Sequence, residues 1–420
     1  MASFDAIPVI LFSIAVFNDT EEIRIMKKIV VAVDSFKGSM TSPEAGNAIK
    51  NGIQEVHPEW NVEVYPVADG GEGTLEALTC RQTVTKRTCT VTGPLGNHVE
   101  ASYLWYERNS QKTAVIEMAQ AAGLPLVPPE KRNPLYTTTY GVGELIRDAI
   151  CQGCRKFIIG IGGSATNDAG VGMLQALGYH FLDKNGKDIS FGAKELAKIT
   201  AIGFEDVPDD LSKCHFQIAC DVKNPLVGIF GCSTVYGPQK GAKADDIENM
   251  ERSIDRFANI VEQIAAADST RVSSTGNRNT PGAGAAGGLG YAFLMFLDGV
   301  LRPGIDIVLE EIGLEEAIVQ SDIVITGEGR LDAQTLMGKT PAGVAVLAKK
   351  HGKPVLAAAG CFGEDVEQCR RSGLFYDCIA VNDILSKQQQ MHAMEKRNAV
   401  KYLKARIRKY FAEERNAKLF

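Results

Sequence analysis

One pattern constrains the fold more than any other feature of the sequence. A short apolar segment, a glycine-bearing loop and a helical segment follow one another several times along the chain. Residues 29–34 lead into the loop "SFKGSM" and then into a segment with Ile49 and Ile53 on one helical face. The same order recurs after residues 62–69 and 322–329. This alternation predicts an α/β protein with largely parallel sheets, whose ligands bind outside the carboxyl ends of the strands.

The middle of the chain shows a different pattern of polar and apolar residues. Residues 87–106, "RTCTVTGPLGNHVEASYLWY", alternate in polarity as antiparallel strands do. We therefore expect two α/β domains, one inserted in the other, with a cleft between them. The outer domain would comprise residues 26–85 and 285–420 and the inserted domain residues 86–284. Residues 1–25 are expected to be an N-terminal extension outside the fold, because the first strand pattern begins directly after Met26. Their apolar stretch is too short to span a bilayer.

Composition excludes several classes of function. The chain is 45% hydrophobic and 23% charged, as in ordinary globular proteins. Its net charge of −6, without a long basic run, argues against nucleic acid or an anionic membrane as partner. The ten cysteines are scattered, which indicates reduced thiols, and the six histidines show no metal-binding spacing. We expect a cytoplasmic protein, with a homodimer as an open alternative.

The stretch "FIIGIGGSATNDAGVGM" carries a glycine-rich loop after an apolar run. Gly160, Gly162 and Ala165 match a dinucleotide fingerprint, and Asp183 stands where the ribose-binding acid is expected. A polar run that ends in Asp168 argues against this interpretation, because helix packing needs apolar residues there and a carboxylate would face the pyrophosphate. An NAD-dependent dehydrogenase of a small hydroxy acid stays open as an alternative.

A second phosphate-binding motif is incomplete. The sequence "MGKT", residues 337–340, ends as a P-loop does, but Ala333 stands where that motif needs a glycine. Lys339 can still contact phosphate as a point charge. The chain is therefore not a P-loop protein by its sequence rule.

Several further loops combine small hydroxyls, glycines, carboxylates and a lysine or arginine. Phosphoryl transfer needs this mixture, because backbone N–H groups and cations hold the phosphates while carboxylates hold Mg²⁺ or orient the attacking hydroxyl. Each acid also has a structural interpretation: Asp34, Asp69 and Asp168 could serve helix N-termini. Glu328 and Arg330 could form a solvated ion pair worth under about 1 kcal/mol.

Taken together, the loops resemble a known family. "AVDSFKGS", "ADGGEGT", "GGSATNDAG", "ACDVKNPL", "YGPQKGA", "GAGAAGGLG" and "ITGEGRLDAQTLMGKTPAG", in this order, are similar to motifs of the bacterial glycerate kinase family of glyoxylate, galactarate and glucarate breakdown. The resemblance runs from about Met26 to about Gly360, and Ala169 stands where the family usually has glycine. It implies an ATP- and Mg²⁺-dependent glycerate 2-kinase, which transfers the γ-phosphoryl group to D-glycerate and gives 2-phosphoglycerate. It also implies two α/β domains with a cleft.

The matching motifs supply candidate site residues. The candidate catalytic residues are Asp168, Lys37 and Lys339. The candidate substrate-binding residues are Ser35, Lys37, Arg330, Glu328 and Asp332. The candidate nucleotide- and phosphate-binding residues are Gly162, Gly163, Ser164, Thr166, Lys240, Gly287 and Gly288. The candidate metal ligands are Asp69 and Asp221.

These residues have expected roles. Lys37 and Arg330 would bind the carboxylate of glycerate, and Asp168 would orient or deprotonate its attacking hydroxyl. Lys240 and Lys339 would neutralise the transferred phosphoryl group. The sequence leaves open which hydroxyl is phosphorylated. A non-enzymatic protein that binds a small acid between two lobes is the third alternative.

Overall fold

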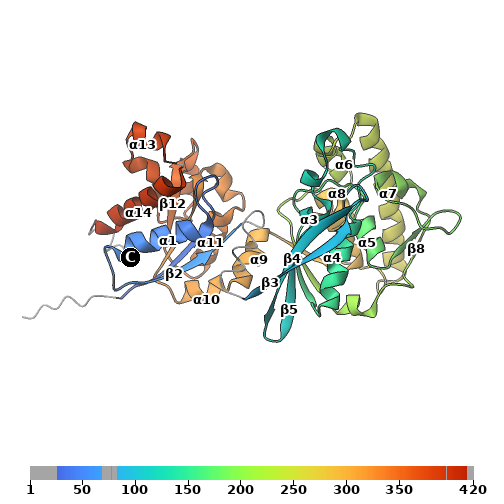
Figure 1. Ribbon diagram of the computed structural model, residues 1–420, viewed down its shortest axis with the longest axis horizontal. Coiled ribbons are helices and arrows are strands. Elements are labelled where there is room, and N and C mark those ends of the chain that lie inside the picture. Colours follow the sequence, from blue (N-terminus) through green and yellow to red (C-terminus); the bar gives the residue numbers. More distant parts are fainter. Residues whose placement is uncertain (1–25, 69–76, 78–82, 394, 414–420) are drawn as a thin grey trace, which may run out of the picture.

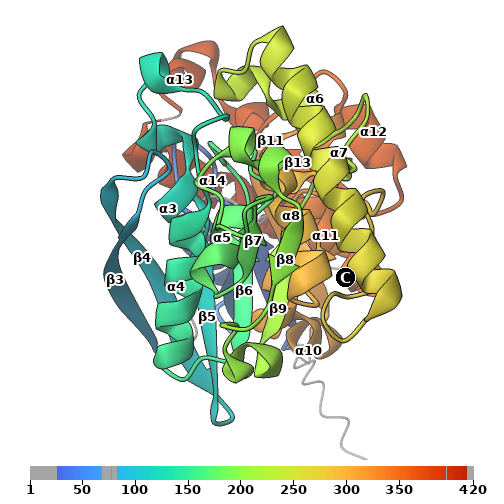
Figure 2. The same ribbon diagram turned by 90° about the vertical axis from the view of Figure 1, so that its right-hand side faces the viewer.

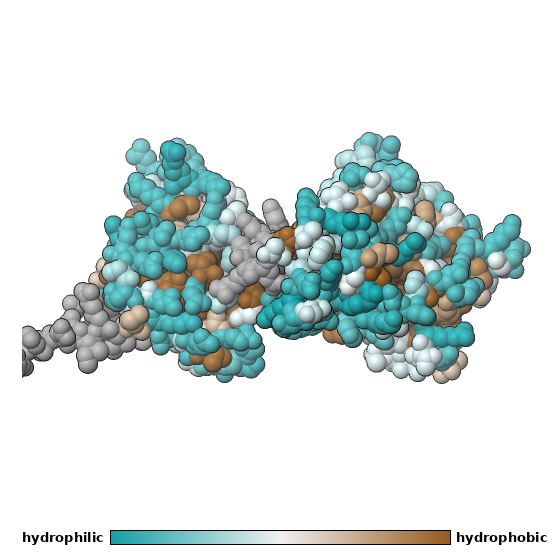
Figure 3. All heavy atoms as spheres, turned by 60° about the horizontal axis from the view of Figure 1, so that its bottom comes forward, coloured by the Kyte–Doolittle hydropathy of each residue, from teal (hydrophilic) through white to brown (hydrophobic). Residues whose placement is uncertain are grey.

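The computed structural model describes residues 26–68, 77, 83–393 and 395–413. The molecule has two lobes, each built around its own sheet (Figure 1). Hydrophilic side chains cover most of the visible face of both lobes in Figure 3. Among the described residues, no helix is both long and apolar enough to cross a bilayer.

The first sheet has five parallel strands in the order β13-β12-β11-β1-β2. Its strands are β1 (Lys28–Val33), β2 (Asn61–Pro66), β11 (Ile323–Leu331), β12 (Val355–Phe362) and β13 (Asp377–Ala380). The chain adds β2 on one side of β1 and β11 on the other, so the direction of winding reverses between β1 and β11. This reversal is a topological switch point, where open α/β sheets bind ligands.

The second sheet has six strands in the order β10-β9-β6-β5-β4-β3. Its strands are β3 (Val84–Thr92), β4 (His98–Arg108), β5 (Gln111–Glu117), β6 (Lys156–Gly160), β9 (His215–Ala219) and β10 (Val300–Arg302). The strands β5, β6, β9 and β10 are parallel, and β3 and β4 add an antiparallel edge. The antiparallel strands predicted for residues 87–106 are thus confirmed. A small separate sheet pairs β7 (His180–Leu182) with β8 (Ala201–Gly203).

Helices cover both sheets (Figure 2). In the first lobe they are α1 (Ser42–Gln54), α9 (Gly304–Glu311), α10 (Leu314–Val319), α11 (Thr340–Lys350), α12 (Val366–Arg371), α13 (Lys387–Met391) and α14 (Lys396–Ala412). In the second they are α3 (Ala119–Ala122), α4 (Tyr140–Cys151), α5 (Val171–Ala176), α6 (Cys232–Tyr236), α7 (Ala244–Ala267) and α8 (Ala285–Phe296).

The core of the first lobe has two layers because successive strand residues point to opposite faces. Ile29 and Val31 of β1 pack with α1 and α14, whereas Val30 packs with α9, α10 and α11. Strands buried on both faces explain the continuous apolar run "IVVAV".

The two lobes meet through α9. The cluster that contains Ile305 and Val308 of α9 also contains Tyr106 of β4 and Ile158 of β6. Glu311 at the end of α9 accepts hydrogen bonds from the hydroxyl of Tyr106 and from Lys156. Apolar packing and a buried carboxylate therefore join the lobes.

Candidate active site

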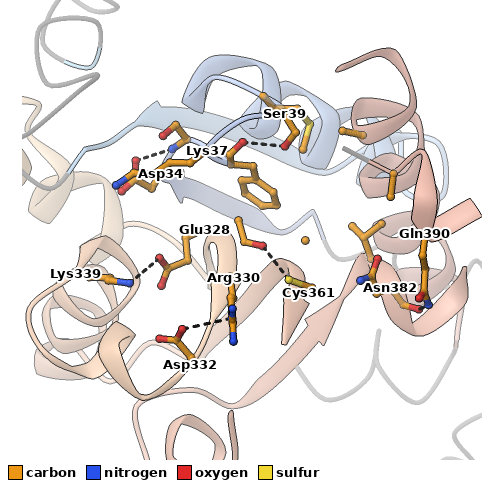
Figure 4. Close-up of a pocket in the computed structure, with 18 of the residues that line it drawn as sticks. Asp34, Lys37, Ser39, Glu328, Arg330, Asp332, Lys339, Cys361, Asn382 and Gln390 are labelled. Atoms are coloured by element: carbon orange, nitrogen blue, oxygen red, sulfur yellow. Dashed lines mark hydrogen bonds and ion pairs between the residues drawn. The ribbon is translucent and has the colours of Figure 1, made fainter. Parts of the chain in front are cut away.

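A cavity of about 720 Å³ lies at the carboxyl ends of β1, β11, β12 and β13, across the switch point of the first sheet. Its lining has two chemically different ends. The charged end consists of Asp34, Lys37, Glu328, Arg330, Asp332 and Lys339. The neutral end consists of Val381, Asn382, Gln390, Ala393 and Ala399. In Figure 4, Asp34, Lys339 and Glu328 lie on the side opposite to Asn382 and Gln390.

The loop after β1 forms one wall of this cavity. The backbone of Phe36 and that of Met40 exchange hydrogen bonds of 2.9 and 3.0 Å, which closes the loop. Gly38 sits at the turn with φ +81°, a conformation that favours glycine. The loop leaves Lys37 exposed, and α1 begins directly after it. The sequence "SFKGSM" is therefore a rigid turn that presents Lys37 at the cavity.

Asp34 connects two parts of the first cavity. Its carboxylate accepts hydrogen bonds from the backbone N–H of Ser35 at 2.6 Å and from the hydroxyl of Thr340 at 2.8 Å. Thr340 is the first residue of α11. The carboxylate thus holds the start of α11 against the end of β1. Lys339 directly precedes α11 and lines the cavity.

Glu328 is a largely buried acid of the first cavity, and its pKa differs from that of an ordinary glutamate. Its carboxylate accepts the hydroxyl of Thr335 at 2.6 Å, and the ammonium of Lys339 lies 3.7 Å away. Burial raises the pKa of Glu328, and the nearby Asp34 and Asp332 add to this rise while Lys339 opposes it. A carboxylate with a raised pKa beside a cation suits proton transfer near neutral pH.

Asp332 lines the charged end of the cavity and also caps a short helix. Its carboxylate caps the short helix at 333–336 by accepting the backbone N–H of Gln334 at 2.9 Å. Arg330 lies 3.6 Å from Asp332 and is largely exposed. The guanidinium of Arg330 is therefore available to an anion at the cavity mouth.

A second cavity of about 380 Å³ lies at the carboxyl ends of β6 and β9 in the second sheet. Gly162, Gly163 and Ser164 form its floor, and Gly163 has φ +74°. Lys240 enters it from the loop before α7, and Asp221 lies exposed after β9. One carboxylate oxygen of Asp221 accepts the backbone N–H of Gly304 at 3.0 Å.

Lys240 is the most unusual group of the second cavity. Its side chain is 2% exposed, and its ammonium donates to the hydroxyl of Ser164 at 2.7 Å and to the carbonyl of Thr166 at 2.6 Å. Within the described residues no ion pair joins it to a carboxylate. Burial lowers the pKa of Lys240 to about 8. The cavity therefore holds a buried cation that a small anion can neutralise.

Asp168 lies in neither cavity. Its carboxylate is 1% exposed and accepts four hydrogen bonds: from the N–H and hydroxyl of Thr139 at 2.8 and 2.9 Å, and from the N–H groups of Gly170 and Gly172 at 3.2 and 3.3 Å. Burial raises the pKa of Asp168. This environment joins the glycine-rich loop to the start of α4. It does not present a base to a substrate, which differs from the expected catalytic role.

Thr166, Gly287 and Gly288 also line neither cavity. A Cβ atom on Gly287 would lie 2.1 Å from the carbonyl oxygen of Thr166, so the start of α8 packs directly on the loop. Ala169 has φ +51°, a left-handed conformation that is costly for alanine. Gly287 and Gly288 serve backbone packing here.

The structure divides the sequence-predicted residues that it describes into those at the first cavity, those at the second, and those at neither, which are Asp168, Thr166, Gly287 and Gly288. The first cavity brings together Ser35, Lys37, Glu328, Arg330, Asp332 and Lys339. The second brings together Gly162, Gly163, Ser164, Lys240 and Asp221. Asp69 lies outside the described residues, and among the described residues no group of three or more potential metal-binding side chains occurs.

The dehydrogenase alternative does not fit this structure. A dinucleotide fold continues from the glycine loop into a helix and a neighbouring parallel strand. Here β7, the next strand after β6, pairs antiparallel with β8 in a separate sheet. Asp183 accepts backbone N–H groups of Asn185 and Lys187 in its own turn. The match to the fingerprint is therefore fortuitous.

The neutral end was not predicted from the sequence. Val381 follows β13, and Gln390 lies in α13, far in the sequence from the motifs. The run "KQQQ" is polar but has no spacing that would indicate a ligand. The packing of the short helix 381–384 on β12 and that of α14 on α1 bring this segment to the cavity.

Comparison with known proteins gives consistent matches. A family model described as "Glycerate kinase family" matches residues 29–412. A glycerate kinase of Halalkalibacterium halodurans is 45% identical over 366 residues, which is 87% of this chain and 94% of the relative. A glycerate 2-kinase of Escherichia coli is 46% identical over 347 residues, 83% of this chain and 88% of the relative. A crystal structure that carries the name glycerate kinase 2, from Salmonella typhimurium LT2, matches with a TM-score of 0.81 at 39% identity, covering 94% of this chain and 100% of that one.

Proposed function

We propose the reaction of this protein from its family: the chain belongs to the glycerate kinase family, and it is an ATP-dependent phosphotransferase that acts on D-glycerate. We propose 2-phosphoglycerate as the product, which the name of the Escherichia coli relative, glycerate 2-kinase, supports. The structural observation that carries the proposal is the charged end of the first cavity. There a carboxylate of raised pKa, Glu328, lies beside the cation Lys339 at a topological switch point.

In the transfer step, the 2-hydroxyl oxygen of glycerate attacks the γ-phosphorus of ATP, and the bond from this phosphorus to the β,γ-bridging oxygen breaks. ADP leaves with the electron pair, and the hydroxyl proton passes to a carboxylate of the protein. Lys37, Arg330 and Lys339 would neutralise the phosphate oxygens through charge-assisted hydrogen bonds.

We propose Glu328 as the acceptor of this proton. Its environment suits proton transfer: Thr335 and Lys339 contact its two oxygens and fix their positions, and burial raises its pKa. Asp168 was expected in this role, but it lies outside both cavities and is already saturated with donors. We therefore assign Asp168 to the support of the glycine-rich loop.

The chain also offers oxygen ligands for Mg²⁺. Mg²⁺ usually takes one or two carboxylates together with phosphate oxygens and water, so a preformed cage is not required. The exposed carboxylate of Asp221 and the acids of the charged end fit this requirement. Mg²⁺, when bound, would neutralise charge on the phosphate oxygens. We propose Asp221 as a ligand; Asp69, outside the described residues, stays a candidate.

We propose that the two lobes are two domains with a cleft that closes during the reaction. The strand order supports this division, because the chain leaves the first sheet after β2 and returns to it at β11. The expected boundary at 285 moves in this proposal to about 303, because α8 packs in the second core and β10 belongs to the second sheet. The helices α13 and α6, which border the first and second cavities, belong to different lobes but lie toward the same side of the molecule, the top in Figures 1 and 2.

We propose a cytoplasmic location, where ATP is available. The cysteines within the described residues are free thiols, which supports a reducing compartment. The proposed small-molecule partners are D-glycerate and ATP.

One assay tests the proposed function directly. The protein is incubated with Mg-ATP and D-glycerate, and the product is identified by phosphorus NMR. We expect the resonance of 2-phosphoglycerate together with ADP. A 3-phosphate product would contradict the proposed hydroxyl, and ADP release that does not depend on glycerate would contradict the proposed acceptor.

A further inference from the structure

The two ends of the first cavity face different parts of the molecule. The neutral end is formed by the segment from β13 to the start of α14, and α14 packs on α1 at the side of the first lobe away from the second (Figure 1). The charged end includes Lys339, which directly precedes α11, and α11 contacts α9 between the lobes. A ligand that fills the whole cavity would therefore point its anionic part toward the second lobe.

The two cavities differ in size in a way that separates the two substrates. The first has a volume of about 720 Å³ and the second about 380 Å³. Both lie in the usual range of small-molecule pockets, and the larger cavity suits the larger substrate, ATP. Glycerate has seven non-hydrogen atoms and one carboxylate. It would leave the neutral end of the first cavity empty, whereas the adenosine of ATP needs uncharged surface with a few polar groups.

The second cavity has the chemistry for a small carboxylate. The ammonium of Lys240 has three N–H donors, of which Ser164 and the carbonyl of Thr166 take two. The third remains for a ligand. Gly162 and Gly163 line the same cavity. A single carboxylate would satisfy the buried cation.

Resting on the proposed kinase function, we propose that the neutral end of the first cavity binds the adenine and ribose of ATP. The triphosphate then lies along the charged end, and D-glycerate binds in the second cavity with its carboxylate on Lys240 and Ser164. The side-chain amide of Asn382 supplies a donor and an acceptor for the edge of adenine. The amide nitrogen of Gln390 already donates to the carbonyls of Asn382 and Leu385 at 3.3 Å, so Gln390 supplies its amide oxygen as an acceptor. This arrangement reverses the sequence-based assignment, which gave Lys37 and Arg330 to glycerate and the glycine-rich loop to ATP.

Photolabelling locates the nucleoside. The protein is irradiated with 2-azido-ATP and Mg²⁺ without glycerate, with and without excess ADP, and labelled peptides are mapped by mass spectrometry. We expect ADP-protected label within residues 381–399. Protected label within residues 219–240 would overturn the assignment. Glycerate phosphorylation is measured on the same preparation, so a failure of the kinase function is seen separately from a misplaced nucleoside.

Substitutions at the neutral end give a second, independent reading. Asn382→Ala and Gln390→Ala each remove an amide that lines the cavity, and Gln388→Ala removes an exposed amide of the same helix as a matched control. We expect each of the first two to raise the KM for ATP about five- to tenfold, with the KM for glycerate within about twofold. A rise in the KM for glycerate instead, or no change in the KM for ATP in the double variant, would overturn the proposal.

Discussion

The two cavities use charge in opposite ways. At the charged end of the first, acids and bases compensate one another: Lys339 lies 3.7 Å from Glu328, and Arg330 lies 3.6 Å from Asp332. In the second, Lys240 is buried with only neutral oxygen atoms as hydrogen-bond partners. A cluster of paired charges can accept an ion as highly charged as Mg-ATP. Lys240 instead forms no ion pair within the described residues, and Asp168 acts on it only through its more distant charge, so this buried cation favours a single small anion. Charge compensation, more than the number of charges, separates the two sites.

The largest expected effect tests the acid of the first cavity. Glu328→Gln keeps the shape of the side chain but removes its capacity to take a proton. We expect kcat to fall by about 10²- to 10⁴-fold, because general base catalysis contributes a factor of this size. Steady-state kinetics measure the change, and circular dichroism checks the fold.

The pH profile gives the same prediction a second readout. Because burial raises the pKa of Glu328, activity should be lost on acidification at a higher pH than an ordinary glutamate would cause. Glu328→Gln should remove this acidic limb. Glu364→Gln changes an exposed acid that follows the neighbouring strand β12, and serves as the control. If Glu328→Gln kept near wild-type turnover, Glu328 would not be the base.

The second prediction removes the buried cation. Lys240→Met replaces the ammonium with an apolar group of similar length. We expect the KM for D-glycerate to rise about 10- to 100-fold, because a hydrogen bond to a charged group is worth about 1.5–3 kcal/mol. The KM for ATP should change far less, which substrate-saturation kinetics can show.

The ionisation of Lys240 should also appear in the pH profile. Its pKa lies near 8, so the protonated form that binds an anion is lost as the pH rises above about 8. The KM for glycerate should then rise by about tenfold per pH unit, and Lys240→Met should be insensitive in this range. Lys243→Met, an exposed lysine three residues on, is the control. A selective rise in the KM for ATP would refute the contrast between the cavities.

The smallest effect concerns the acid that supports the second cavity without lining it. Asp168→Asn keeps the shape but leaves one acceptor oxygen where the carboxylate has two, so Thr139, Gly170 and Gly172 cannot all keep their bonds. We expect a lower midpoint of thermal unfolding, equivalent to about 1–3 kcal/mol, and a kcat within severalfold of wild type. Thr139→Ser, which keeps the hydroxyl bond to Asp168, should be close to wild type in both measurements. A loss of turnover by orders of magnitude at unchanged stability would restore Asp168 as a catalytic residue.

Much of the architecture followed from local sequence. The alternation of apolar segments, glycine loops and helices is visible in any single segment because backbone propensity and apolar periodicity are local properties. It predicted the parallel sheets and placed Asp34 at a strand end, where the structure has it. Glu328 was expected in a loop after a strand but lies within β11, which continues to Leu331. The motif "GGSATNDAG" identified a polar loop, and the order of all motifs identified the family.

Tertiary packing alone decided which side chains of those motifs face a cavity. Asp168 and Ser164 stand four residues apart in one loop, yet Asp168 is enclosed by α4 and α5 and Ser164 lines the second cavity. Asn382 reaches the first cavity because its short helix, residues 381–384, directly follows β13 and packs on β12. Gln390 lies between this short helix and α14, which packs against α1 more than three hundred residues away in sequence. Local sequence determines the type of element and the chemistry of its loop. The burial of each side chain depends on partners that are distant in the chain, and these exist only in the folded protein.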